Sequence, residues 1–403
     1  MKIKKDAVFS DPIYGHIKVE RGFIKELIGS SYFQRLRRIK QLSGVTMVFH
    51  TAEHSRFSHS MGAYEIARKF LEIEDIKNQL SDRDKDLFLA TALLHDIGHG
   101  PNSHAFEKVF NTNHEKIGAK IITNDPEIFQ ILNSLDENFA DDVSSILMKT
   151  NKFPLLEQLI SSQLDVDRLD YLIRDSYQTG VPYGQVDVDK IIRTINVVDN
   201  NVVFKASALH TLESFFFNRY HMYWQVYYHP TGRAYEFILE NIYKRVHDLL
   251  EQGYLFKEDL TYLIRVMKDP FDIEAYKVID DYYINGLINS FTRSGDSILK
   301  ALSNDFFNRN IWKYVDSNDS ELIDKIKKTY NSEQIRYFCG VTAVRQSVYQ
   351  MSLYDKEREL LIFDNDKIVK LSDKSDIIKN LINNPKKTDD KFFYKEILWI
   401  KYM

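Results

Sequence analysis

The sequence predicts a mainly α-helical fold: a helical bundle followed by a small α+β region at the C-terminal end. Three observations lead to this prediction. Apolar residues recur at helical spacing through most of residues 22–180. Long aromatic-rich helical runs follow at about 207–228 and 231–252, and helical character continues to about residue 330. Beyond that point the chain turns to β-branched and aromatic runs, which are typical of strands.

The elements of the first half follow from local signals. Residues 6–20 are expected to be extended, with breaks at Pro12 and Gly15. Ser81 has the position of an N-cap for a helix that runs to about Ile97, and Gly98 then ends it. Other helices are expected near 58–73, 102–110, 114–123, 137–149, 155–163 and 166–177.

The remaining segments include the expected strands. TINVVDNNVVFK (194–205) contains two β-rich runs around Asn200, which predicts a hairpin. Near the C-terminus we expect strands in IRYFCGVTAV (335–344), ELLIFDNDKIVKL (359–371) and FFYKEILWIKY (392–402). We therefore divide the chain into a helical body, 1–330, whose motifs lie within 11–180, and a small α+β region, 331–403.

Composition excludes several classes of protein. The chain has 403 residues and a formal net charge of −4, so it has no overall attraction for nucleic acid or an anionic membrane. A single cysteine, Cys339, excludes an internal disulfide and a cysteine-rich zinc site. The N-terminal MKIKKDAVF has no apolar run of the kind a signal peptide carries, and no stretch near the central motif is long enough to cross a bilayer. We expect a cytoplasmic protein without membrane or nucleic-acid partners.

Histidines concentrate in LLHDIGHGPNSH, residues 93–104. Adjacent residues of a helix point about 100° apart, so His95 and Asp96 can converge on one ion only where the helix ends, as expected before Gly98. Imidazole and carboxylate ligands suit Zn, Fe, Mn or Ni, and the lack of thiolates argues against a structural zinc site. Taken alone, a His-Asp pair is more often a surface feature.

Two further stretches strengthen the case. EHSRFSHSMG (53–62) precedes the motif, and QLDVDRLDYLIRDS (163–176) follows it with acids and bases at helical spacing. Such a charged helix face is usually a solvated ladder of salt bridges. Here, however, His59, the pair His95-Asp96 and Asp167 follow one another on separate helices, which is the order H…HD…D.

In these motifs the chain resembles the deoxynucleoside triphosphate (dNTP) triphosphohydrolases of the HD superfamily. That group contains bacterial dGTPases and the catalytic domain of the SAM-and-HD-domain protein. The matching stretches span the first 180 residues in family order, with a weaker echo at YYHP (227–230). They are DPIYGHI (11–17), FQRLRRIKQL (33–42), HSRFSHSMG (54–62), LLHDIGHGPNSH (93–104), HE (114–115) and DVDRLDYLIRDS (165–176).

The resemblance implies a metal site and a triphosphate site. The family holds a divalent transition metal (Fe, Mn, Zn or Ni) on the positions of His59, His95, Asp96 and Asp167. Two imidazoles and two carboxylates leave coordination positions for water and a phosphate oxygen. Mg²⁺ bound to the substrate phosphates is compatible with this site.

The resemblance also assigns substrate contacts. A triphosphate carries about four negative charges and favours arginine donors. The family uses the positions of Arg56, Arg168 and Tyr171 for phosphates. Salt bridging among Arg168, Asp170 and Arg174, with the acid between the two bases, is the structural alternative. The resemblance also implies sugar contacts at Gln41, Leu42 and Asp175, and a substrate contact at His229 in the weaker match YYHP.

The predicted proton-transfer residues are His104, Glu107 and His114. His104 and Glu107 are three residues apart, so the carboxylate can orient the imidazole and raise its pKa, as a general acid requires. His114 matches a further pocket position of the family. His99 either supports the site or is structural, and the sequence leaves both interpretations open, while His54 is expected to be structural.

The family also suggests regulation and assembly. In regulated members the segment equivalent to FQRLRRIKQL binds an activating nucleotide between subunits, yet Gly29 stands where a guanine-reading aspartate would be. Gln225 replaces an arginine, so one phosphate contact is either missing or supplied by Arg219 or Arg233. Consecutive aromatics at 215–217 cannot all face one core, which predicts a homo-oligomer, with a tetramer favoured by the family.

The sequence therefore predicts metal-dependent hydrolysis of dNTP to deoxynucleoside and inorganic triphosphate by attack at the α-phosphate. Two alternatives stay open. One is an HD phosphohydrolase that acts on another nucleotide phosphoester, and the other is a nucleotide-binding sensor with little catalysis. The predicted triphosphate contacts argue against the first alternative, and the intact ligand set argues against the second.

Overall fold

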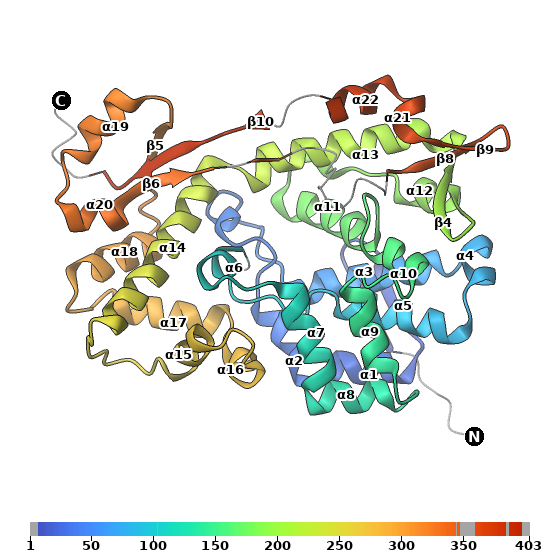
Figure 1. Ribbon diagram of the computed structural model, residues 1–403, viewed down its shortest axis with the longest axis horizontal. Helices are drawn as coiled ribbons and strands as arrows, with labels where there is room; N and C mark the ends of the chain where they lie inside the picture. Colours follow the sequence, from blue (N-terminus) through green and yellow to red (C-terminus); the bar gives the residue numbers. More distant parts are fainter. Residues whose placement is uncertain (1–6, 103, 344, 347–358, 384–386, 397–403) are drawn as a thin grey trace.

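A computed structural model describes residues 7–102, 104–343, 345–346, 359–383 and 387–396 of the chain. Helices make up most of this part, and the strands form small sheets (Figure 1). The predicted mainly helical fold is confirmed. No helix among these residues is both long enough and apolar enough to cross a membrane.

The first half of the chain is built from short helices. Their bounds are α1 Gly22–Gly29, α2 Ser31–Arg35, α3 Arg56–Phe70, α4 Glu74–Gln79, α5 Asp82–Leu94, α6 His104–Phe110, α7 His114–Asn124, α8 Pro126–Asn133, α9 Phe139–Leu147, α10 Pro154–Ile160, α11 Val166–Thr179 and α12 Val188–Thr194. Ser81 caps α5 in a reciprocal capping box with Asp84, as its sequence suggests. The helix ends at Leu94, earlier than predicted, and the His95 Nδ1 atom lies 2.9 Å from the carbonyl oxygen of Ala92 in the last turn.

Three of these helices form the centre of the fold. α3 packs against both α5 and α11 (Figure 1). The core between them is apolar and fully buried, with Ile66, Leu93 and Leu169 each 0% exposed. Burial of this kind is the main driving force that holds the helices in register. The predicted metal ligands lie on these three helices or directly after one of them.

The second half contains longer helices. They are α13 Leu209–Met222, α14 Pro230–Glu251, α15 Thr261–Lys268, α16 Ile273–Val278, α17 Asp281–Phe291, α18 Ser297–Phe307, α19 Ser320–Lys327, α20 Ser332–Phe338, α21 Leu371–Lys374 and α22 Asp376–Asn383. The helix predicted over 207–228 is α13 continued by a π-helix, Tyr223–Tyr227. Short π-helical segments are rare and often occur at functional sites.

Within the described part of the chain, the strands form four small sheets. β1 (Ala7–Asp11) and β2 (Gly15–Val19) form an antiparallel hairpin, and the predicted hairpin is confirmed as β3 (Ile195–Val198) with β4 (Asn201–Lys205). β4 pairs in parallel with β8 (Leu361–Asp364), which pairs with β9 (Lys367–Lys370). β11 (Lys391–Tyr394) lies between β5 (Lys313–Asp316) and β6 (Cys339–Thr342), and β7 (Arg345–Gln346) pairs with β10 (Lys387–Thr388).

The strand predicted over 335–344 is wrong in its first four residues. These residues end α20, because Asn331 and Gln334 form a capping box that starts a helix there. Part of the strand predicted over 392–402 lies outside the described residues. β4 and β5 lie before residue 330 and pair with strands that lie after it. The domain boundary at residue 330 therefore stays a prediction.

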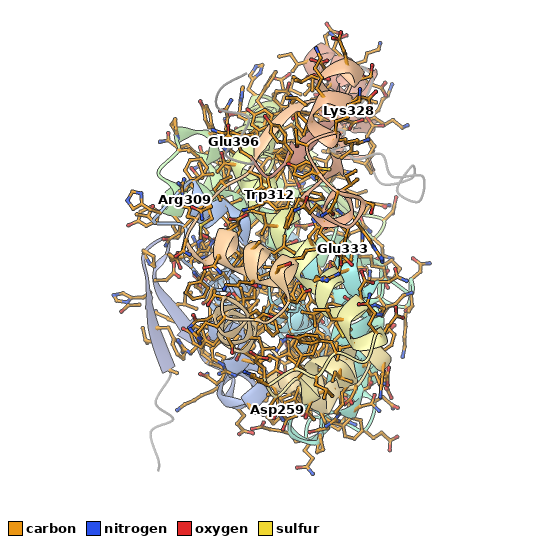
Figure 2. All side chains as sticks on the ribbon, turned by 90° about the vertical axis from the view of Figure 1, so that its left-hand side faces the viewer. Asp259, Arg309, Trp312, Lys328, Glu333 and Glu396 are labelled. Atoms are coloured by element: carbon orange, nitrogen blue, oxygen red, sulfur yellow. The ribbon has the colours of Figure 1, made fainter. Side chains whose placement is uncertain are left out.

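The C-terminal region packs on α14. Figure 2 looks onto this end of the molecule, where Trp312 is 4% exposed and donates its indole N–H to Asp305. Arg233 of α14 donates hydrogen bonds to the side chain of Asp389 and the backbone carbonyl of Thr342. This tie places Thr342 at the wall of the cavity described below.

Candidate active site

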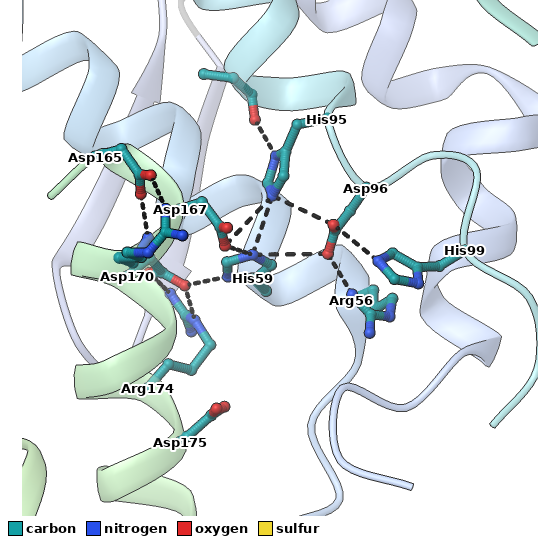
Figure 3. A network of polar contacts seen from close by, with 12 residues as sticks. Arg56, His59, His95, Asp96, His99, Asp165, Asp167, Asp170, Arg174 and Asp175 are labelled. Carbon is teal, nitrogen blue, oxygen red and sulfur yellow. Dashed lines mark hydrogen bonds and ion pairs between the residues drawn. The ribbon is translucent and has the colours of Figure 1, made fainter. Parts of the chain in front are cut away.

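Three helices present the predicted metal ligands to one point (Figure 3). His59 lies near the start of α3, His95 is the C-cap of α5, and Asp167 is in the first turn of α11. Asp96 follows His95, where the chain has left the helix. The helix end therefore allows two adjacent side chains to converge, as the motif suggests.

The ligand atoms lie close together. The Nε2 atoms of His59 and His95 are 3.2 Å apart, and Oδ1 of Asp167 lies 3.1 Å from His59 Nε2 and 3.7 Å from His95 Nε2. Oδ1 of Asp96 lies 3.4 Å from His95 Nε2, and its Oδ2 lies 3.7 Å from His59 Nε2. His59 is 0% exposed and His95 is 8% exposed, so water screens the two imidazoles little, whereas the side chain of Asp167 is 35% exposed toward the cavity side of the site.

The hydrogen bonds of the two histidines fit a metal ion. Nδ1 of His59 lies 2.8 Å from the carboxylate of Asp170, and Nδ1 of His95 lies 2.9 Å from the carbonyl oxygen of Ala92. Both partners are acceptors, so each Nδ1 carries the proton and each Nε2 offers a lone pair. The two lone pairs and a carboxylate oxygen of Asp167 lie within 4.8 Å of one another and repel unless a cation lies between them, and Asp96 adjoins both histidines. The donor set therefore fits a divalent transition metal held by His59, His95, Asp96 and Asp167.

The pKa values of His59 and Asp167 also show that this cluster of carboxylates favours a positive charge among its members. Burial acts to lower the pKa of His59, but its contacts with Asp167 and Asp170 outweigh burial and raise it to about 10. Burial acts to raise the pKa of Asp167, but the two histidines outweigh burial and hold it well below its ordinary range. A bound metal supplies the positive charge that a proton would otherwise bring.

Asp96 also anchors a second group of polar residues. Arg56 donates from Nη1 to Asp96 at 2.6 Å, and Nε2 of His99 lies 3.3 Å from the other Asp96 oxygen. His99 stacks on His114 with ring centres 3.8 Å apart, and Nδ1 of His114 lies 2.7 Å from Glu107. Burial, together with Arg56 and His114, lowers the pKa of His99 well below its usual value, so His99 is neutral at pH 7. His99 thus supports the site rather than standing apart from it.

A cavity of about 540 Å³ opens beside the metal ligands. Its lining includes most of the predicted substrate residues. These are Gln41, Leu42, Arg56, Arg168, Tyr171 and Asp175. The predicted metal ligands Asp96 and Asp167 and the predicted proton-transfer residue His114 line it as well. The volume is within the range of small-ligand pockets, and the side chains combine carboxylates, cations and aromatic rings. Such a cavity suits a charged ligand with a ring system.

Two predicted residues do not line the cavity, and nothing is described of the side chain of a third. His229 is not among the cavity's lining residues; its side chain caps α14 by accepting from the backbone N–H of Thr231. Glu107 contacts His114 rather than lining the cavity. His104 is the first residue of α6, and its side chain lies outside the described residues.

The charged residues around α11 form two separate ion pairs. Arg168 bonds through Nη1 to Asp165, while Arg174 pairs with Asp170. The salt bridge of the structural alternative is therefore present between Asp170 and Arg174, whereas Arg168 pairs with Asp165 and not with Asp170. The Arg168 Nε atom is buried without a hydrogen-bond partner among the described residues, and the side chain lines the cavity.

The sugar-contact position is also organised by buried partners. Both oxygens of Asp175 are engaged, one with His54 Nε2 at 2.8 Å and the other as acceptor from the Tyr227 hydroxyl at 2.7 Å. His54, expected to be merely structural, therefore orients a cavity carboxylate. Its long-range contact, 121 residues along the chain, is the reason the local sequence does not reveal it.

Sequence reasoning missed the aromatic wall of the cavity. Tyr223, Tyr227 and Tyr228 line it from the π-helix and the residue after it. Arg219, one turn before, is 1% exposed, and its guanidinium lies 5.7 Å from the Tyr223 ring centre. Its Nε and Nη1 atoms have no hydrogen-bond partner among the described residues. The density of aromatics in YHMYWQVYYHP (220–230) was the available signal.

Comparisons with known proteins agree with this geometry. Residues 56–175 match the HD domain model, and residues 186–390 match the model of the HD associated region. The Bacillus subtilis protein YwfO is 37% identical over 98% of this chain and 94% of its own length. The human deoxynucleoside triphosphate triphosphohydrolase SAMHD1 is 28% identical over 80% of this chain and 56% of its own length. A crystal structure of a phosphohydrolase from Bacteroides thetaiotaomicron, 27% identical, superposes with a TM-score of 0.85 and covers 98% of this chain and 100% of that one.

Proposed function

This chain belongs to the HD-domain phosphohydrolases, and from that premise we propose that it hydrolyses dNTP to deoxynucleoside and inorganic triphosphate. The observation that carries the proposal is the shared cavity. Metal-site carboxylates Asp96 and Asp167 line the same space as Arg56, Arg168 and a set of tyrosines. Relatives named as deoxynucleoside triphosphate triphosphohydrolases, among them the Dictyostelium discoideum homologue of SAMHD1 at 28% identity, support the choice of substrate.

The cations near the cavity suit a triphosphate. A chain of three phosphates carries about four negative charges and needs charge-assisted donors as well as a metal. Arg56 and Arg168 line the cavity. Arg219 does not line the cavity, but its guanidinium lies 5.7 Å from the ring centre of Tyr223, which does. Two of its nitrogens lack partners among the described residues, which is costly in a buried position unless a ligand satisfies them. We assign Arg219 as the phosphate contact that Gln225 does not supply.

The sugar and base would lie toward the tyrosines. Gln41, Leu42 and Asp175 line one side of the cavity, and Asp175 is held by His54 and Tyr227. Tyr223, Tyr227 and Tyr228 offer ring faces and edges against which a nucleobase can pack. The deoxyribose then lies between the base and the phosphates, as the chemical order of a dNTP requires.

The reaction needs a nucleophile at the α-phosphorus and a proton for the leaving 5′-oxygen. When bound, the divalent metal supplies Lewis acidity and lowers the pKa of a water molecule. Arg56 fixes the orientation of Asp96 through their 2.6 Å bond. We assign the proton on the leaving oxygen to His104, with Glu107 and His114 in support. General acid catalysis of this kind contributes about 10²–10⁴-fold.

Product analysis tests the proposal. Protein loaded with Mn²⁺, Fe²⁺, Zn²⁺ or Ni²⁺ is incubated with each of the four dNTPs, and the products are separated by anion-exchange chromatography. We expect deoxynucleoside and triphosphate in equal amounts from at least one dNTP, and none from Asp167→Asn. The control variant His210→Ala changes an exposed histidine outside the cavity and should keep full activity. Release of dNMP with pyrophosphate, or dNDP with orthophosphate, would favour action on another phosphoester bond.

A further inference from the structure

We propose that a buried network reaching from the N-terminal hairpin positions the metal ligand His59 and thereby controls how tightly the metal is held. The network consists of Asp11, Tyr14, Asp170 and Arg174, with Gly62 making room for it. None of these residues is a predicted ligand, and none lines the cavity. The inference rests on the metal site and not on the identity of the substrate.

Asp170 is the centre of the network (Figure 3). Its Oδ2 lies 2.8 Å from His59 Nδ1 and accepts from Arg174 Nε at 2.9 Å. Its Oδ1 accepts from the Tyr14 hydroxyl at 2.8 Å and from Arg174 Nη2 at 3.0 Å. Each oxygen thus has two partners, which leaves the carboxylate no freedom to rotate away from His59.

The N-terminal turn fixes the other side of the network. Asp11 ends β1, and its Oδ1 accepts from the backbone N–H groups of Ile13 and Tyr14 at 2.9 and 3.2 Å. Its Oδ2 accepts from Arg174 Nη1 at 2.9 Å. One carboxylate therefore shapes the turn that presents the Tyr14 hydroxyl and also holds the guanidinium that orients Asp170.

Gly62 shows how closely the parts approach. It lies on α3, three residues after His59, on the same side of the helix. A Cβ atom at this position would lie 1.8 Å from Asp170 Oδ1 and 2.5 Å from Arg174 Nη2. Any side chain here would push the Asp170–Arg174 pair away from α3. The glycine is therefore required for the carboxylate to reach His59.

Burial explains why these contacts act on the metal site. Asp170 is 0% exposed and Arg174 is 1% exposed, so an ion pair here gains little net stability over apolar packing. What the pair provides is a fixed acceptor for His59 Nδ1, which keeps the Nε2 lone pair turned toward the other ligands. Loss of an acceptor of this kind typically weakens metal binding about 10–100-fold.

Metal affinity, measured without any nucleotide, tests the proposal. Metal-free protein competes with a chromogenic chelator for Zn²⁺, which gives Kd, and release from loaded protein gives the dissociation rate. The variants are Asp170→Asn, Gly62→Ala and Tyr14→Phe. The matched controls are Gly286→Ala, a helical glycine with no atom near its Cβ position, and Tyr282→Phe, a tyrosine that is 67% exposed. Circular dichroism and the melting temperature of the metal-free proteins show whether each variant is folded.

We expect Kd for Zn²⁺ to rise about 10–100-fold in Asp170→Asn and Gly62→Ala, and a few-fold in Tyr14→Phe, with faster release in each. Both controls should keep the wild-type Kd. A purely structural network would lower the melting temperature of the metal-free variants and leave Kd unchanged, and that result would overturn the proposal. If the first two variants fail to fold, Tyr14→Phe decides, because it removes one hydroxyl and keeps the ring. Since no nucleotide is present, the outcome does not depend on whether dNTP is the substrate.

Discussion

Replacing Arg219 and replacing Arg168 should have opposite effects on the free energy of unfolding, although both arginines are assigned to phosphate contacts. Arg219 is 1% exposed and has no carboxylate within ion-pairing distance among the described residues, whereas Arg168 pairs with the fully buried Asp165. A buried cation without a counter-ion costs free energy in the absence of ligand, and a buried carboxylate that loses its cation does the same. Arg219→Met should therefore leave the ligand-free protein as stable as wild type or more stable. Arg168→Met should destabilise it by about 3 kcal/mol, the lower end of the range, because Asp165 keeps its backbone donors at Ser162 and Arg168.

Both variants should lose activity. A hydrogen bond to a charged group contributes about 1.5–3 kcal/mol, which corresponds to a fall in kcat/KM of about 10- to 100-fold for each arginine. The assays are urea unfolding of the metal-loaded, ligand-free proteins and initial rates of deoxynucleoside release. An Arg219→Met protein that is less stable than wild type and keeps its kcat/KM would refute the assignment, because the arginine would then serve the fold alone.

The remaining predictions concern the metal, packing, pH and assembly. His95→Ala should lose the bound metal, measured by elemental analysis, together with turnover, since one of four ligands is gone. Gly98→Ala should destabilise the fold by about 3 kcal/mol in urea unfolding, because its Cβ would lie 2.1 Å from the backbone oxygen of His114; Gly29→Ala, with open space around it, should not. Burial acts to raise the pKa of Asp296, but Arg245 and the backbone N–H of Leu299 outweigh burial and lower it. The stability that this carboxylate contributes is therefore present above its ordinary pKa of about 4 and is lost as the pH falls below that value. Asp296→Asn should therefore lower the melting temperature at pH 7 and flatten its decline below pH 4. Light scattering should show a homo-oligomer, and a monomer with and without nucleotide would contradict that expectation.

The ligand set could be predicted because its signals are local. His95 and Asp96 adjoin at a helix end that Ser81 and Gly98 delimit, and His59 and Asp167 lie near the starts of their helices. Spacing of this kind survives in the sequence without any knowledge of the tertiary fold. The mainly helical class follows from periodicity for the same reason.

The partners of these residues could not be predicted, because they depend on long-range contacts. Tyr14 and Asp170 are 156 residues apart, and Asp11 and Arg174 are 163 apart. Only the packing of the N-terminal hairpin near α3 and α11 brings them together. His229 shows the opposite case: its sequence context predicts a substrate contact, whereas in the structure its imidazole caps the N-terminus of α14 and does not line the cavity. A sequence motif indicates which residues occur together, but whether a side chain caps a helix depends on where the backbone starts that helix.

The central claim is that the enzyme breaks the bond between the α-phosphorus and the 5′-oxygen of dNTP. Hydrolysis in ¹⁸O-labelled water tests it directly, because water adds its oxygen to the atom that is attacked. We predict one ¹⁸O atom in the inorganic triphosphate and none in the deoxynucleoside, as read by mass spectrometry of the separated products. Label in the deoxynucleoside, or in orthophosphate released with dNDP, would contradict the account.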